Sequence, residues 1–141
     1  MKPIGYWLNR TDQALTRQMN DMLDGVGLTR IAWQVLNVIQ DTPRVADTEV
    51  RATLSANADI PTLTAAIDAV LVEGWATRPA PNRLSLTPEG SQRLARVVER
   101  VDMFRKRATA GISQDEYGTA VRVLERMTRN LEAPTDAVRG Q

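Results

Sequence analysis

The sequence contains no cysteine and no histidine. Without cysteine there can be no disulfide, no thiolate zinc site, no cysteine nucleophile and no switch based on thiol oxidation. Without histidine the chain lacks the commonest general base and the commonest metal ligand. Its Asp and Glu residues are scattered rather than grouped at the spacing of metal ligands. We therefore expect no enzyme, with no catalytic residue, no cofactor and no metal site.

Long apolar runs are also missing. No stretch approaches the roughly 18 uninterrupted apolar residues of a membrane span, and residues 1–6 are too few and too polar for a signal sequence. The 141 residues are 43% hydrophobic and 25% charged with a net charge of +1, which is typical of a packed globular chain. We expect a cytoplasmic protein without a membrane partner, built as one domain or as two small lobes that share a core.

The spacing of apolar residues at intervals of three and four predicts a mainly α fold. One long helix is expected over 4–24, where Gly25 should take the left-handed conformation that ends a helix, and a second over 29–43. Two shorter helices are expected over 47–54 and 59–74. Because a tight turn joins these two, they form a helix-turn-helix candidate.

The remaining half of the sequence predicts a hairpin and two more helices. Extended runs at 75–78 and 83–86 flank a proline-rich loop, which favours a hairpin. The Thr-Pro-Glu run at 87–89 predicts the start of a helix, because it offers a hydroxyl cap, a first-turn proline and a carboxylate at the positive end of the helix dipole. Ser113 then caps a final helix whose apolar stripe reaches Leu131.

This order predicts a winged helix-turn-helix lobe at 29–90, with helices 4–24 and 91–131 forming a dimerisation lobe. The central elements are too short to bury the apolar faces of both end helices. Pairing with a second copy of the chain is the simplest way to cover those faces. The alternative is an antiparallel bundle folded back within a single chain.

Two short motifs point to a known family. The run Gly-Leu-Thr at 27–29, followed by Trp33 and Leu36, and the run Leu-Thr-Pro-Glu-Gly at 86–90 occur in the order and separation of the MarR-type winged-helix transcriptional regulators. The chain resembles this family over residues 4–131. The resemblance implies a homodimer that binds a pseudo-palindromic operator in double-stranded DNA, with the fourth helix in the major groove and the hairpin near the minor groove.

The resemblance also implies specific contacts. Small hydroxyl residues of the fourth helix and basic residues in and near the wing are expected to touch DNA, whereas Ala65 and Ala69 stand where family members often carry arginine. The acidic residue Asp68 matches a common family position, and the wing is several residues short. The candidate DNA-binding residues are Arg44, Arg51, Thr62, Thr64, Arg78 and Arg83.

The net charge of the predicted winged helix-turn-helix lobe leaves a second hypothesis open. Residues 44–90 carry four basic and six acidic side chains, a balance of −2. Since DNA affinity depends largely on phosphate neutralisation, this lobe should bind a duplex weakly. The alternative to a DNA-binding regulator is a winged-helix dimer with weakened DNA binding that serves as a ligand-sensing or protein-interaction module.

For a small aromatic effector, the resemblance points to the crevice between the two lobes. Such an effector is expected to release the DNA by changing the spacing of the two recognition helices. Aromatic residues on helical stripes are usually core, so simple packing is the competing interpretation. The candidate ligand-binding residues are Tyr6, Trp7, Arg10, Trp33, Asn37 and Phe104.

Overall fold

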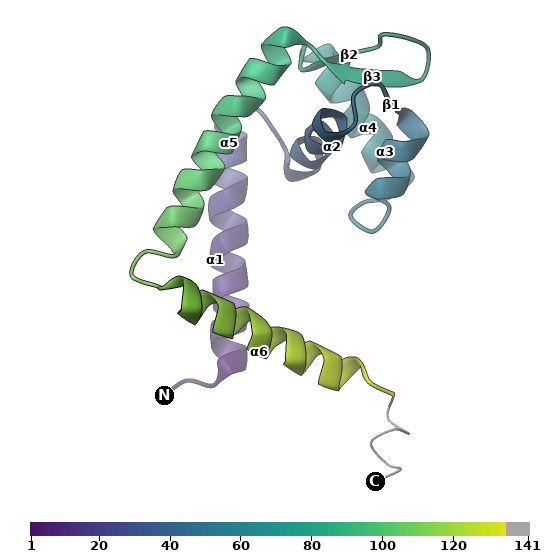
Figure 1. Ribbon diagram of the computed structural model, residues 1–141. Helices are drawn as coiled ribbons and strands as arrows, with labels where there is room; N and C mark the ends of the chain where they lie inside the picture. The colour runs from purple at the N-terminus through teal and green to yellow at the C-terminus, as the bar shows by residue number, and fades with distance from the viewer. Residues whose placement is uncertain (135–141) are drawn as a thin grey trace. The chain divides into compact units, whose positions relative to one another are not determined.

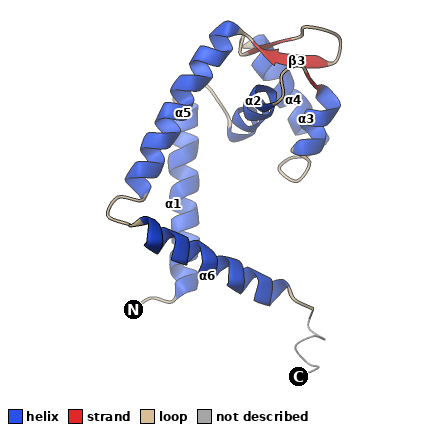
Figure 2. Cartoon of the chain, viewed as in Figure 1, coloured by secondary structure: helices blue, strands red, loops and turns tan. Residues whose placement is uncertain are grey.

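The computed structural model describes residues 1–134, which form six helices and three short strands (Figures 1 and 2). By contacts the chain divides into two compact units, Met1–Asp102 and a second that begins at Met103. The elements are α1 (Ile4–Asp24), α2 (Arg30–Asp41), β1 (Val45–Ala46), α3 (Asp47–Thr53), α4 (Ile60–Val72), β2 (Ala76–Thr77), β3 (Arg83–Leu86), α5 (Pro88–Ala108) and α6 (Gln114–Glu132).

Polar side chains cap the starts of α2 and α6, and the cap predicted at Ser113 is confirmed. The Thr29 hydroxyl accepts a hydrogen bond from the backbone N–H of Ala32 at 3.2 Å, which begins α2. Ser113 and Glu116 form a reciprocal capping box at the start of α6, and these bonds hold the pKa of the Glu116 carboxyl below its usual value. Local side-chain chemistry thus fixes where these helices begin.

The end of α1 differs from expectation in one residue. The helix stops at Asp24 as predicted, but Gly25 keeps a right-handed conformation with φ of −61°. The left-handed residue is Gly27, with φ of 77°, and Leu28 donates its backbone N–H to the carbonyl of Leu23 at 2.9 Å. The left-handed glycine therefore lies two positions later than expected, although the helix ends where predicted.

The sheet contains a strand that the sequence did not predict. The strand order is β1-β3-β2, and both pairings are antiparallel. Val45 of β1 lies opposite Leu84 of β3, whereas Ala76 of β2 lies opposite Leu86. A two-residue strand has no periodicity of its own, so β1 exists only through its distant partner.

The core of the first unit joins the two long helices to the winged elements. Leu23 of α1, Leu36 of α2, Leu63 of α4, Leu84 of β3 and Leu94 of α5 are all completely buried in one cluster. The end of α1 and the beginning of α5 therefore pack in the same core as the helix-turn-helix. The second unit differs, since α6 contains no buried residue.

A close backbone approach fixes the transition from the wing to α5. Thr87 donates its backbone N–H to the carbonyl of Trp75 at 3.0 Å and its hydroxyl to the carbonyl of Gly74 at 2.7 Å. The Thr87 hydroxyl also accepts from the N–H of Gly90 at 2.8 Å. A Cβ on Gly90 would overlap the carbonyl oxygen of Trp75, so only glycine fits there.

We expect Gly90→Ala to destabilise the protein by roughly 1–3 kcal/mol, because the backbone of Trp75 must move to admit the methyl group. Gly25→Ala is the matched control: its φ is right-handed and its Cβ would make only ordinary contacts. Urea unfolding at one fixed protein concentration measures both. Equal midpoints for the two variants would contradict the close approach described above.

Candidate nucleic-acid interface

α4 follows the turn after α3, and it has one face buried in the core and one face exposed to solvent. Leu63, Ala66, Ile67 and Val70 are buried, and α4 packs mainly on α2. This burial fixes the rotation of the helix. As a result, the two candidate threonines, at positions 62 and 64, are exposed on the first two turns of α4.

The beginning of α4 is held by Asp59. Its carboxylate accepts a hydrogen bond from the backbone N–H of Thr62 at 2.9 Å. Hydrogen bonding to Thr62 lowers the pKa of Asp59 below its ordinary value, because these bonds favour the ionised carboxylate. The cap satisfies a free N–H of the first turn and keeps the position of Thr62 defined.

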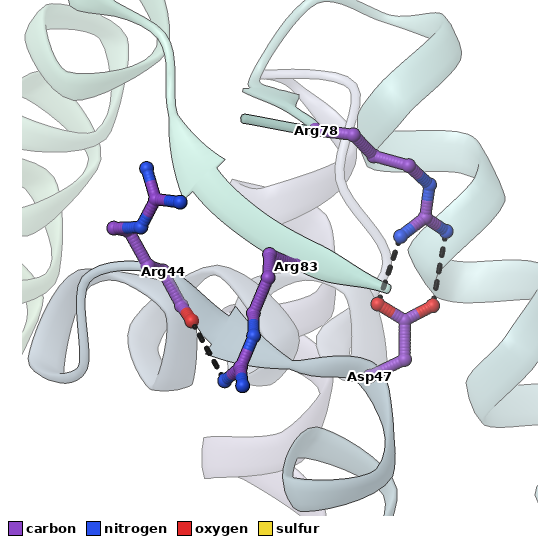
Figure 3. Close-up of polar contacts among 4 residues, drawn as sticks. All are labelled: Arg44, Asp47, Arg78 and Arg83. Carbon is purple, nitrogen blue, oxygen red and sulfur yellow. Dashed lines mark hydrogen bonds and ion pairs between the residues drawn. The ribbon is translucent and has the colours of Figure 1, made fainter. Parts of the chain in front are cut away.

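Two of the candidate arginines meet at the base of the wing. Arg44 has a left-handed backbone with φ of 59°, donates its N–H to the hydroxyl of Ser85 at 3.1 Å, and accepts at its carbonyl from Arg83 Nη1 at 3.3 Å. Figure 3 shows the two guanidinium groups extending in different directions from this contact. Both side chains are exposed, so the wing base carries two positive charges that face solvent.

Arg78 is engaged differently. Its guanidinium donates to both carboxylate oxygens of Asp47, each at 2.9 Å (Figure 3). The Asp47 side chain is only 12% exposed, and its hydrogen bonds raise the pKa of Arg78. This ion pair ties the residue after β2 to the first residue of α3. Sequence analysis did not identify Asp47 as a functional residue, because no local pattern links it to a residue 31 positions away.

The structure brings some of the six candidate DNA-binding residues together and leaves others apart. Arg44 and Arg83 share a hydrogen bond, whereas Arg78 pairs with Asp47. Arg51 lies half-buried in the last turn of α3, and both threonines lie on α4. The six candidates therefore fall into three groups. Arg44 and Arg83 form a pair at the wing, and Arg78 forms an ion pair with Asp47. The other three lie on the two helices of the helix-turn-helix.

Five of the candidate ligand-binding residues belong to the first unit, where they lie on α1 and α2. Tyr6 and Trp7 meet edge to face at 5.0 Å, and Arg10 donates to the Tyr6 hydroxyl at 2.8 Å, all exposed on α1. α1 begins to pack on the core at Met19. Arg10 lies nine residues earlier in this helix, which is about 14 Å at 1.5 Å per residue.

The other three candidates lie elsewhere. Trp33 and Asn37 are half-buried, one turn apart on α2, and Phe104 belongs to the second unit. The indole N–H of Trp33 is buried and has no hydrogen-bond partner among the described residues. Within residues 1–134 there is also no group of three acidic side chains able to hold a metal ion, and no helix apolar and long enough to cross a membrane.

Solved structures share this architecture. A cysteine-to-serine mutant of MarR from E. coli, complexed with operator DNA, is 24% identical over 89% of this chain and 93% of that chain, with a TM-score of 0.69. A MarR-family protein from Mycobacterium tuberculosis, in complex with DNA, is 21% identical over 94% and 100%, also with a TM-score of 0.69. The transcriptional repressor CouR, bound to p-coumaroyl-CoA, is 26% identical over 90% and 92%, with a TM-score of 0.71.

No protein-family model and no curated protein sequence matches the chain. The structural likeness defines the fold: the chain has the winged-helix architecture of the MarR-family regulators. This confirms the predicted fold class and, at the level of the fold, the resemblance seen in the two sequence motifs.

We expect the Asp47–Arg78 pair to show a coupling energy of about 1 kcal/mol in a double-mutant cycle, because it is bidentate and Asp47 is largely shielded from water, although the half-exposed Arg78 is screened. The control cycle is Glu125–Arg129, a pair one turn apart on α6 whose side chains are 52% and 75% exposed, with a coupling of at most about 0.5 kcal/mol. Thermal unfolding of the alanine variants gives both values. A coupling no larger than that of the control would show that the pair does not fasten the wing.

Proposed function

We propose that the protein is a DNA-binding transcriptional regulator that acts as a homodimer on a pseudo-palindromic operator. The observation that carries the proposal is the extent of the structural likeness: two structures solved with DNA match about nine-tenths or more of this chain. The exposed face of α4 and the exposed arginines of the wing base supply the surface that such a function needs.

In this proposal α4 enters the major groove and the wing follows the backbone. Thr62 and Thr64 face outward for base contacts, and Arg44 and Arg83 provide charges for phosphates. Arg51, at the end of α3, is a third candidate for a phosphate. Arg78 holds the wing against α3 through Asp47, so it contributes position more than free charge.

The dimer is argued from α6. Tyr117, Val121 and Leu131 are 56%, 45% and 83% exposed and recur at helical spacing on a helix with no buried residue. Trp7 and Leu15 on α1 are likewise exposed, at 49% and 42%. Apolar faces of this extent are seldom left in water, and a second copy offers a matching surface to each.

A small aromatic effector is the second element of the proposal. The unpartnered indole N–H of Trp33 offers a hydrogen bond to a carbonyl or carboxylate, and an aromatic group would pack on the half-buried ring. The neighbour CouR was solved with an aromatic CoA ester. Binding beside α2 would release DNA if it favoured a dimer whose recognition helices have the wrong separation.

We expect the purified protein to bind a fluorescent duplex of mixed sequence at low salt. Arg83→Gln, which keeps a donor for the Arg44 carbonyl, should lower the slope of log affinity against log salt by about one for each protomer. The control is Arg100→Gln on α5, about 18 Å along the helix from Pro88, which should leave the slope unchanged. Fluorescence anisotropy at several salt concentrations measures both.

Two results would contradict the DNA-binding proposal. One is the absence of duplex binding at tens of micromolar protein and low salt, which would favour the ligand-sensing or protein-interaction module instead. The other is an equal loss of slope in both variants, which would show that charge anywhere on the chain has the same effect.

We expect sedimentation equilibrium to give twice the chain mass of 15.6 kDa. Val121→Glu places a charge in the apolar stripe of α6 and should return the mass to that of a single chain. Thr119→Glu introduces the same charge on the opposite side of α6 and should leave the dimer intact. A wild-type protein that sediments as a single chain at micromolar concentration would contradict the homodimer.

A further inference from the structure

The exposed face of α4 has an unusual chemical composition. The thirteen residues of the helix, Ile60–Val72, include no Lys, Arg, Asn or Gln, and their only charged side chain is Asp68. Burial of the opposite face means that this is a property of the surface and not only of the sequence. The exposed side chains are those of Ile60, Pro61, Thr62, Thr64, Ala65, Asp68, Ala69 and Val72.

This composition limits which bases the helix can read. Guanine is normally recognised by Arg or Lys, which donate to its O6 and N7, and adenine by the amide of Asn or Gln. The face of α4 supplies neither group. It supplies methyl groups, which complement the C5 methyl of thymine, two threonine hydroxyls, which can hydrogen-bond to more than one base, and one carboxylate, which can accept from the N4 amino group of cytosine.

The surroundings of α4 are compatible with this arrangement. The carboxylate of Asp68 lies close enough to Arg78 to contribute to that residue's raised pKa, so a nearby cation offsets its repulsion from phosphates. The exposed arginines of the wing base, Arg44 and Arg83, lie outside the helix. Positive charge for the backbone and apolar groups for the bases are thus on different elements.

We infer that α4 selects its DNA site by contacts of its methyl groups with thymine, and that no side chain of α4 makes the paired hydrogen bonds by which Arg or Lys reads guanine. Ala65 and Ala69, with the methyl groups of Thr62 and Thr64, form the thymine-reading surface. This inference rests on the proposed DNA-binding function. It adds the chemistry of the bases that the site must contain and assigns a reading role to two alanines where a charged side chain would otherwise be expected.

The test begins with selection of bound duplexes from a random-sequence pool by the full-length protein. In the duplex of highest affinity, each thymine is then replaced singly by deoxyuridine, which lacks only the C5 methyl. At least one thymine in each half-site should lose about fourfold in affinity, the value of one buried methyl group. Replacing each guanine by 7-deazaguanine, which removes the N7 acceptor, should leave affinity unchanged at the positions that α4 covers.

A matched pair of variants assigns the effect to the helix. Thr64→Ser keeps the hydroxyl and removes the methyl group, whereas Thr64→Val keeps the methyl group and removes the hydroxyl. If methyl contact is the basis of reading, the serine variant loses sensitivity to deoxyuridine at one thymine and the valine variant keeps it. Circular dichroism of both proteins checks that the helix content is unchanged.

The outcomes separate this inference from the proposed function. A selected duplex whose affinity is indifferent to every deoxyuridine, or which weakens with 7-deazaguanine under α4, overturns thymine reading and leaves DNA binding standing. Failure to select any duplex overturns the proposed function and the inference with it. Loss of deoxyuridine sensitivity in the valine variant rather than the serine variant would show that the hydroxyl reads the base.

Discussion

The rotation of α4 about its own axis is the constraint on which the rest of the interface depends. Leu63, Ile67 and Val70 are buried against the core, and exposing side chains of this size costs roughly 1.5–3 kcal/mol each. No other rotation keeps them covered. The residues between them are therefore forced outward, and the helix offers a surface of methyl groups, hydroxyls and one carboxylate.

Much of the fold could be predicted from the sequence because its signals are local. The hydroxyl of Thr29, the carboxylate of Asp59 and the box of Ser113 and Glu116 each lie within one turn of the helix that they begin. Such contacts can be inferred from spacing alone. The order of helices and the wing followed from these signals and from apolar periodicity.

The features that could not be predicted depend on distant partners. β1 exists because Val45 meets Leu84, and Asp47 matters because its partner Arg78 is 31 residues away. Gly25 and Gly27 are both glycines near a helix end, so only the folded backbone decides which takes the left-handed conformation. The candidate site was predicted as a set of residue types, whereas the pairing of Arg78 with Asp47 and the hydrogen bond of Arg83 to Arg44 depend on the folded chain.

The pairing of Arg78 with Asp47 changes how the lobe's charge of −2 should be understood. One basic and one acidic side chain neutralise each other at the wing, and the Asp59 carboxylate is directed at the backbone of α4. In the DNA complex that we propose, the phosphate contacts of the wing come from Arg44 and Arg83, which are exposed. Two linked copies of the chain would bind DNA more tightly than one, since a second linked contact adds to the first without a second cost of association. The apolar stripe of α6, a helix with no buried residue, and the sparse charge of the wing thus both support the homodimer that we propose.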